Sequence, residues 1–314
     1  MAHAIRSLGM ESYLIGIQDR TSFKAAAYAY LRGDIPCILG FALFDCSGES
    51  GNTYEQNIDH KFCGLHAVAL TGYNLPGIEE KPYTPDPILP LAAHRMDKIY
   101  VHDDGVGPFA RMEFDDRVVN AIEDGKKVRC ESLTTYWKKC SGGGEPGSCR
   151  AVLGHLLIPL YPKIRIPLDY IIHQVESFHR RVDEMCNLSS NRILEWDVYI
   201  SRLNPFKEEL ITKKQLHGPA LHKLLTTTLP RFLWRAKLLF DQVLQCELLF
   251  DATDFQDGNT FLCGIDYNGG FFYFLSSTIR DAKNDTQDYY EDLMASPAAT
   301  IFKWIEQENA EELQ

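Results

Sequence analysis

The sequence lacks the long apolar and basic segments by which many membrane and nucleic-acid-binding proteins are identified. No segment approaches the roughly 20 consecutive apolar residues that a bilayer-spanning helix needs, and residues 1–6 lack the apolar core of a signal peptide. No basic run is present, and the net charge is −11, which disfavours nucleic acids and anionic membranes as partners. We therefore expect a cytoplasmic protein that binds neither nucleic acid nor a membrane.

Paired cysteine motifs are also lacking. The nine cysteines are an odd number, and none of them stands at CxxC spacing to another. Scattered cysteines of this kind are more typical of reduced thiols than of a disulfide framework. The sequence predicts no cofactor, and no pattern in it indicates an oligomeric state.

The length and the order of the predicted elements indicate two domains. A chain of 314 residues offers enough core for two domains of ordinary size. The glycine-rich residues 141–148 supply a boundary, so we expect one domain over residues 1–140 and a second over residues 150–314. A linker over residues 115–127 is an alternative end of the first domain. Helical and strand patterns mix without strict alternation, which predicts an α+β fold.

Two predicted strands in the first domain carry the most informative residues. His66 opens the apolar run that ends at Tyr73, and Asp103 follows the apolar run that starts at Ile99. A histidine held by a carboxylate exchanges protons near neutral pH, which nucleophilic catalysis requires. We therefore predict His66 and Asp103 as catalytic residues within hydrogen-bond reach of each other, with Asp104 as the alternative carboxylate. The simpler alternative is a core histidine beside an aspartate that caps a turn.

This strand pair resembles the His and Asn/Asp strands of papain-like cysteine peptidases, and of their C39-like branch in particular. The resemblance covers about the first third of the chain and includes the elements that precede His66. These are the end of a helix at Ala4–Leu8, a strand at Ser12–Ile17, a helix at Ser22–Arg32 and a strand at Cys37–Leu43. The resemblance implies a hydrolase of peptides or other amides, in which His66 protonates the leaving group and Asp103 orients the imidazole.

The nucleophilic cysteine of that family is the missing part. It stands at a helix N-terminus before both strands, where this sequence has none. Cys37, Cys46 and Cys63 do not occupy that position, and Cys149, after the glycine-rich segment, fits only a permuted arrangement. We therefore expect a truncated start, with an upstream cysteine, or a relative that is inactive as written. The alternative is a non-catalytic regulatory protein that binds a peptide or partner.

Two further groups of residues suggest metals as distant alternatives. His60, Cys63 and His66 recur at three-residue intervals, and His102 or Asp103 would complete a zinc set. Asp251 and Asp254 follow a predicted strand and offer oxygen ligands to a hard cation, although paired aspartates more often belong to a turn. We predict no metal in the site.

The second domain resembles no family, and only its elements are predicted. The amphipathic spacing of Ile171, Val175 and Phe178 predicts a helix over Leu168–Cys186. We expect strands at Ala151–Ile166, Glu195–Ile200 and Glu247–Asp251, a helix from Leu229 to Leu244, and a hairpin over Phe261–Leu275 that turns at Asn268-Gly269.

Overall fold

The computed structural model describes residues 1–17, 19–46, 60–77, 89–123, 126–135, 149–186, 193–213, 215–254, 259–285 and 287–311. Helices and antiparallel sheets both contribute, which confirms the predicted α+β class. Within these ranges no helix has the length and apolar character needed to cross a membrane.

The chain divides into two compact units. The first comprises Met1–Gly77 and Ala93–Pro162, and the second comprises Ile78–Ala92 and Lys163–Gln314. The expected boundary at residues 141–148 lies outside the described residues, and the strand that follows it belongs to the first unit. The alternative linker is wrong, because residues 115–123 continue one strand and residues 126–127 begin the strand that pairs with it.

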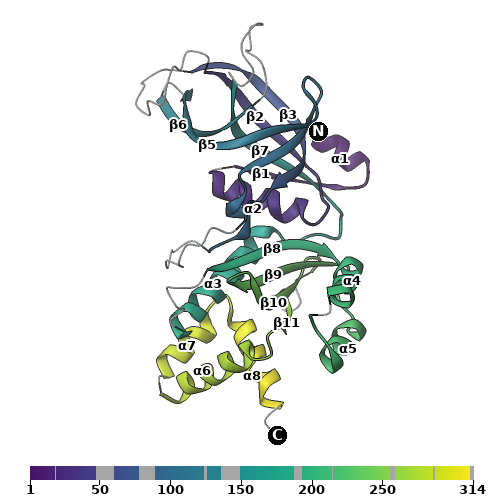
Figure 1. Ribbon diagram of the computed structural model, residues 1–314, viewed down its shortest axis with the longest axis vertical. Helices are drawn as coiled ribbons and strands as arrows, with labels where there is room; N and C mark the ends of the chain where they lie inside the picture. Colours follow the sequence, from purple (N-terminus) through teal and green to yellow (C-terminus); the bar gives the residue numbers. More distant parts are fainter. Residues whose placement is uncertain are drawn as a thin grey trace. The chain divides into compact units, whose positions relative to one another are not determined.

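The first unit is built on one antiparallel sheet in the order β1-β7-β2-β3-β4-β5-β6 (Figure 1). Strand β6 also pairs with β7, so the sheet closes on itself through β7, β2, β3, β4, β5 and β6. The elements are α1 (Ala2–Ser7), β1 (Glu11–Gly16), α2 (Arg20–Leu31), β2 (Cys37–Asp45), β3 (Lys61–Asn74), a 3-10 helix (Ala92–Arg95), β4 (Lys98–Asp103), β5 (Gly107–Glu123), β6 (Lys126–Thr134) and β7 (Cys149–Leu160).

Burial alternates along the strands that carry the predicted site. On β3, Val68 and Leu70 are buried, and the same holds for Ile99 and Val101 on the neighbouring β4. This period of two places one face of each strand in the core. Helix α2 begins at the cap Asp19, whose carboxylate accepts a hydrogen bond from the Ser22 backbone N–H at 2.7 Å. The predicted early elements of the first unit are thus confirmed as helices and strands.

The second unit contains a four-stranded antiparallel sheet in the order β11-β10-β9-β8. Helices α6, α7 and α8 lie together beside it (Figure 1). The elements are α3 (Leu168–Cys186), β8 (Leu194–Arg202), α4 (Leu203–Lys213), α5 (Gly218–Thr226), β9 (Phe232–Phe240), β10 (Val243–Asp251), β11 (Phe261–Asp266), α6 (Phe271–Asp285), α7 (Gln287–Ala295) and α8 (Ala299–Glu311). The predicted helix over Leu168–Cys186 is confirmed, and its Phe178 packs against Trp196 of β8 and Phe302 of α8.

The predicted helix from Leu229 to Leu244 is wrong. The segment instead forms β9, which turns at Asp241-Gln242 into β10. Both turn residues have positive φ, 48° and 67°, as a tight hairpin of this type requires. Because both faces of β9 are buried, its side chains show no clear alternation, and a buried strand then resembles a buried helix in sequence.

The predicted hairpin over Phe261–Leu275 is half wrong, since its first half is β11 but Phe271 begins helix α6. The Asp266 carboxylate accepts hydrogen bonds from the backbone N–H groups of Gly269 at 2.8 Å and Phe272 at 3.1 Å, which directs the chain into the helix. The aromatic run that suggested a strand continues with the buried Leu275 and Ile279 at helical spacing.

A buried ion pair joins the middle strands of the second sheet. The Arg235 guanidinium on β9 donates Nε and Nη2 to the Glu247 carboxylate on β10, and the two side chains are 2% and 0% exposed. Tyr267 donates its hydroxyl to Glu247 at 2.8 Å. Burial works to lower the pKa of Arg235, but the charge of Glu247 outweighs it and raises that pKa. Arg235 therefore carries its charge at neutral pH.

Helix α4 is tied to the same network through Glu209. This carboxylate accepts hydrogen bonds from Arg235, from Lys237 at 2.7 Å and from Lys213 at 2.6 Å. Burial works to raise the pKa of Glu209, but the nearby cations lower it well below its usual range. The network connects the sheet face to the helix that covers it.

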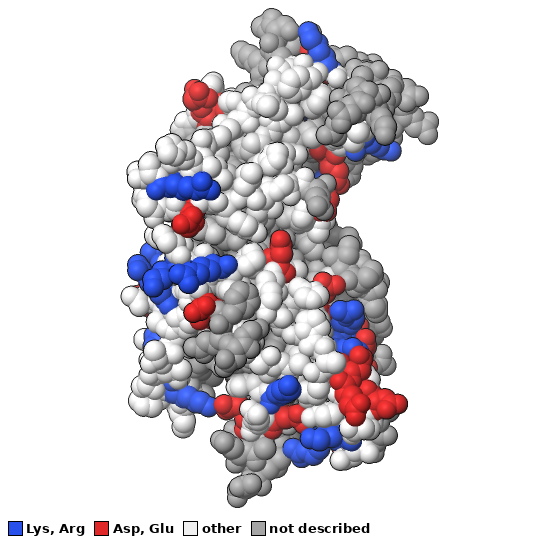
Figure 2. Space-filling model, turned by 180° about the vertical axis from the view of Figure 1, so that it is seen from behind, with Lys and Arg blue, Asp and Glu red and all other residues white. Residues whose placement is uncertain are grey.

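On the face drawn in Figure 2, acidic and basic side chains are both present among broad uncharged areas, and a group of acidic side chains at the lower right has basic side chains beside it. Such mixing fits an ordinary solvated surface. The exclusion of nucleic acid as a partner remains a prediction.

The positive φ of Gly269, 69°, generates a first prediction. A Cβ added at Gly269 or at Gly270 meets no atom within 4 Å, but only Gly269 has a left-handed backbone. Gly269→Ala is therefore expected to lower the free energy of unfolding by about 1–2 kcal/mol, while Gly270→Ala, the matched control, lowers it less. Urea denaturation of both variants is the measurement, and equal losses would contradict the turn geometry.

The Arg235 network generates a second prediction. Arg235→Met leaves Glu247 charged and buried, which is expected to cost about 3–5 kcal/mol of unfolding free energy. The control is Arg231→Met at an exposed position of the same segment. Chemical denaturation measures both, and Arg235→Lys serves if the methionine variant does not fold. If Arg235→Met lowers the free energy of unfolding no more than Arg231→Met does, the ion pair contributes little to stability.

Candidate functional site

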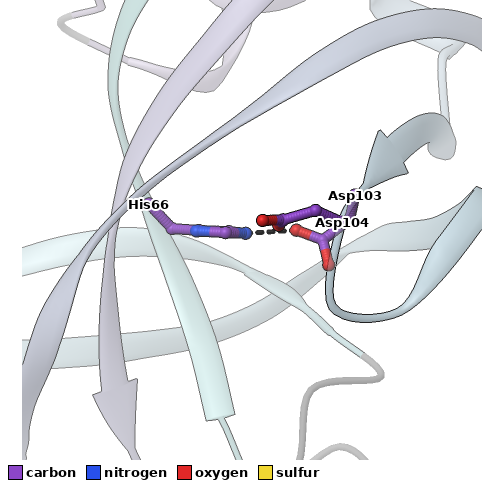
Figure 3. Close-up of side chains that lie close together, drawn as sticks. All are labelled: His66, Asp103 and Asp104. Carbon is purple, nitrogen blue, oxygen red and sulfur yellow. Dashed lines mark hydrogen bonds and ion pairs between the residues drawn. The ribbon is translucent and has the colours of Figure 1, made fainter.

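The predicted histidine and aspartate come together where β4 ends at Asp103 beside His66, which lies within β3. The register pairs Ala69 with His102, so His66 and Asp103 lie on the same face of adjacent strands, opposite to that of His102. The His66 Nε2 and the Asp103 Oδ2 are hydrogen-bonded, as Figure 3 shows. The predicted approach of these two side chains, 37 residues apart in the chain, is confirmed.

The turn that follows β4 holds the Asp103 side chain through hydrogen bonds. Its side chain is 0% exposed, and its Oδ1 accepts the backbone N–H groups of Gly105 at 2.8 Å and Val106 at 2.7 Å. A Cβ at Gly105 would lie 3.2 Å from that same oxygen, so glycine keeps the turn close to the carboxylate. Asp103 therefore caps a turn, as the simpler alternative held, and contacts His66 as well.

Opposing effects act on the Asp103 carboxyl. Burial works to raise its pKa, but the hydrogen bonds from His66, Val106 and Gly105 together outweigh burial, and the pKa is lowered. Asp103 is therefore a carboxylate at neutral pH. An ionised acceptor of this kind fixes the orientation of the imidazole and stabilises its protonated form.

The His66 side chain is partly buried and partly exposed to solvent. Its side chain is 28% exposed, and its ring packs edge-on against Phe41 of β2, with ring centroids 5.6 Å apart. Because Asp103 engages Nε2, proton exchange with a substrate would use Nδ1. The arrangement thus suits a general acid or base in a partly open site.

None of the four cysteines considered in the sequence analysis meets the requirements for the nucleophile. Cys37 is buried, which raises the pKa of its thiol to about 12, whereas a reactive thiol needs a lowered pKa. Cys149 begins a strand and pairs with Asp45, four positions along β2 from Phe41, the residue opposite His66. Four positions on a strand span about 13 Å. Cys46 follows the end of β2, further along in the same direction.

Cys63 is disulfide-bonded, which corrects the expectation that every thiol is reduced. The described cysteines that are not in a disulfide are Cys37, Cys46, Cys130, Cys149, Cys246 and Cys263. A sulfur in a disulfide supplies neither a thiolate nucleophile nor a zinc ligand.

The zinc set suggested by sequence spacing is not brought together. The His60 Nδ1 accepts a hydrogen bond from the Asn120 backbone N–H at 2.9 Å, and Cys63 is oxidised. His102 is exposed, and its ring packs against Phe109. His60 precedes β3, and the pairing of β3 with β2 is irregular between Phe62 and Gly64, so the three-residue spacing does not place these side chains on one face.

Asp251 also serves a turn. Its Oδ1 accepts hydrogen bonds from the Thr253 backbone N–H at 2.6 Å and from the Asp254 backbone N–H at 3.3 Å. This is the turn chemistry that was weighed against a cation site.

Comparisons with known proteins found no matching family model, no matching curated protein and no matching solved structure. The site is therefore interpreted from its own geometry.

The structure adds Phe41 and the Gly105 turn to the residues predicted from the sequence. The Asp-Asp-Gly triplet after a strand is a local signal for such a turn, since aspartate accepts backbone N–H groups two and three residues ahead. The contact of Phe41 with His66 has no local signal, because it depends on strand pairing.

The turn contacts of Asp103 generate a third prediction. Asp103→Ala leaves two backbone N–H groups without their acceptor, so the free energy of unfolding is expected to fall by about 1–3 kcal/mol near pH 7. Because the folded pKa of Asp103 is lowered, its contribution is complete above the unfolded pKa and is lost as pH falls through the folded pKa.

The measurement is urea denaturation of wild type and Asp103→Ala at about pH 7 and about pH 3, with Asp281→Ala at an exposed position of α6 as control. The difference in the free energy of unfolding between wild type and Asp103→Ala should be smaller in acid than at neutral pH. A constant difference would mean that the charge of Asp103 contributes nothing.

Proposed function

We propose that the first unit is a relative of the papain-like cysteine hydrolases of the C39-like branch, with His66 as proton carrier and Asp103 as the group that orients it. The observation that carries the proposal is the hydrogen bond from a buried, turn-anchored carboxylate to a partly exposed imidazole on the neighbouring strand. Support also comes from the order of strands β2, β3 and β4, which is the order that the resemblance requires.

The chemistry proposed for this pair is acyl transfer from an amide or ester. In the complete reaction a thiolate attacks the carbonyl carbon, and His66 gives a proton to the leaving group. Because Cys37, Cys46, Cys63 and Cys149 do not meet the requirements for the nucleophile, we propose that His66 and Asp103 supply the acid–base half of the site and do not perform the covalent step themselves.

A second candidate function is non-catalytic recognition of a peptide or a protein partner, as in a regulatory protein. The positions of the cysteines favour it, because a site without a thiol can bind but not acylate. A cytoplasmic location belongs to both proposals. The free cysteines support it, whereas the disulfide at Cys63 counts against it.

Labelling with a thiol-directed acylating probe distinguishes the two functions. We expect wild type and His66→Ala to be labelled slowly and equally, because Cys37, Cys46 and Cys63 do not occupy the nucleophile position, where a thiol is activated by the imidazole. The measurement is stoichiometry and rate at mildly acidic pH, with the modified residue located by mass spectrometry.

The control is His173→Ala, at an exposed position of helix α3. Rapid labelling at one cysteine that is lost in His66→Ala and kept in His173→Ala would establish an active thiol and contradict the binding function. Rapid labelling at Cys149 would favour the permuted arrangement.

A further inference from the structure

We propose that His66, Asp103 and Asp104 bind a divalent transition-metal ion, with Zn²⁺ as the best match. One potential ligand atom from each side chain lies within 4.8 Å of the other two. Figure 3 shows the three side chains converging on one place at the end of β4. The proposal goes beyond the acid–base function and does not depend on it.

The donor set is suited to a borderline metal. An imidazole nitrogen with two carboxylate oxygens matches Zn²⁺, Co²⁺ or Mn²⁺ better than Ca²⁺ or Mg²⁺, which prefer oxygen ligands alone. This donor set differs from the zinc ligands suggested by sequence spacing. It shares His66 and Asp103 with them but includes neither Cys63 nor His60. In the sequence analysis, Asp104 is only the alternative to Asp103 as the carboxylate that orients His66.

The metal would take the place of the proton that His66 and Asp103 share. Coordination needs the lone pair of His66 Nε2, so the proton between this nitrogen and Asp103 must leave it. In an imidazolium that proton is released to solvent and the Nδ1 proton stays, whereas in a neutral imidazole the single proton is relocated to Nδ1. The charge of the ion then balances the two carboxylates. These lie on consecutive residues and would otherwise repel each other.

The surroundings of Asp103 supply the support that metal ligands require. Its Oδ1 is held by the backbone N–H groups of Gly105 and Val106, so Oδ2 is presented in a fixed direction. His66 is partly exposed and Asp104 is exposed. Water can therefore complete the coordination, as in zinc sites with three protein ligands.

A bound ion would also regulate the proposed acid–base function. It would occupy the His66 nitrogen that Asp103 orients, and the imidazole would no longer be available as imidazolium. Metal-bound and metal-free protein would then differ in any activity that uses His66.

The test is a cobalt titration of the full chain after treatment with a chelator. Co²⁺ replaces Zn²⁺ with the same ligands and reports them through its visible spectrum. We expect saturation at about one equivalent without a sulfur-to-cobalt charge-transfer band, and displacement of cobalt by added Zn²⁺. His66→Ala and Asp104→Asn are each expected to weaken binding more than about tenfold.

Matched controls are His173→Ala and Asp281→Asn, two exposed positions in the second unit, which should bind as wild type does. Circular dichroism of each variant shows whether it is folded. Three outcomes would each overturn the proposal. They are a charge-transfer band from sulfur to cobalt, cobalt binding that is unchanged in folded Asp104→Asn, and the absence of saturable cobalt binding. The readout needs no nucleophile, so failure of the thiol-labelling experiment leaves this test unaffected.

Discussion

The buried carboxylate of Asp103 is the constraint on which the candidate site depends. An ionised group out of contact with water is costly unless hydrogen bonds compensate it. The protein supplies two from the backbone of the following turn and one from His66. The same carboxylate therefore ends strand β4, shapes the turn and fixes the imidazole, so these features cannot change independently.

The closed sheet makes this arrangement possible. His66 and Asp103 are far apart in the chain, yet β3 and β4 are neighbours, and β2 and β5 flank them on either side. Buried apolar side chains such as Val68 and Val101 hold the two strands in register directly beside the site. The well-packed strands hold the two polar side chains rigidly, while the partly exposed His66 can still be reached from solvent. Functional groups on protein scaffolds are usually arranged in this way.

The charged network of the second unit shows why not every cluster of titratable groups suggests a site. The charges of Arg235 and Glu247 are paired, almost wholly buried and directed at each other. Such a network connects strands and a helix at a large desolvation cost, and its value lies in structural specificity rather than in ligand binding. The His66 site differs because its imidazole and Asp104 both reach solvent, where a substrate or an ion can meet them.

Sequence reasoning succeeded where the decisive information was local. The apolar strand segments that follow His66 and precede Asp103, and the amphipathic helix over Leu168–Cys186, are predicted from patterns a few residues long, and the structure contains all three. The errors arose where the decisive partner is distant. Strand β9 is buried on both faces because helices and an ion pair cover it, so no alternation marked it as a strand. The aromatic run after Gly269 forms a helix whose first turn is held by the Asp266 carboxylate, which accepts the Phe272 N–H, and residue spacing did not reveal this interaction. The same limit applies to Asp104, since its place beside His66 is set by the pairing of β3 with β4. A local pattern can therefore nominate a polar residue, but strand register decides which residues share a site.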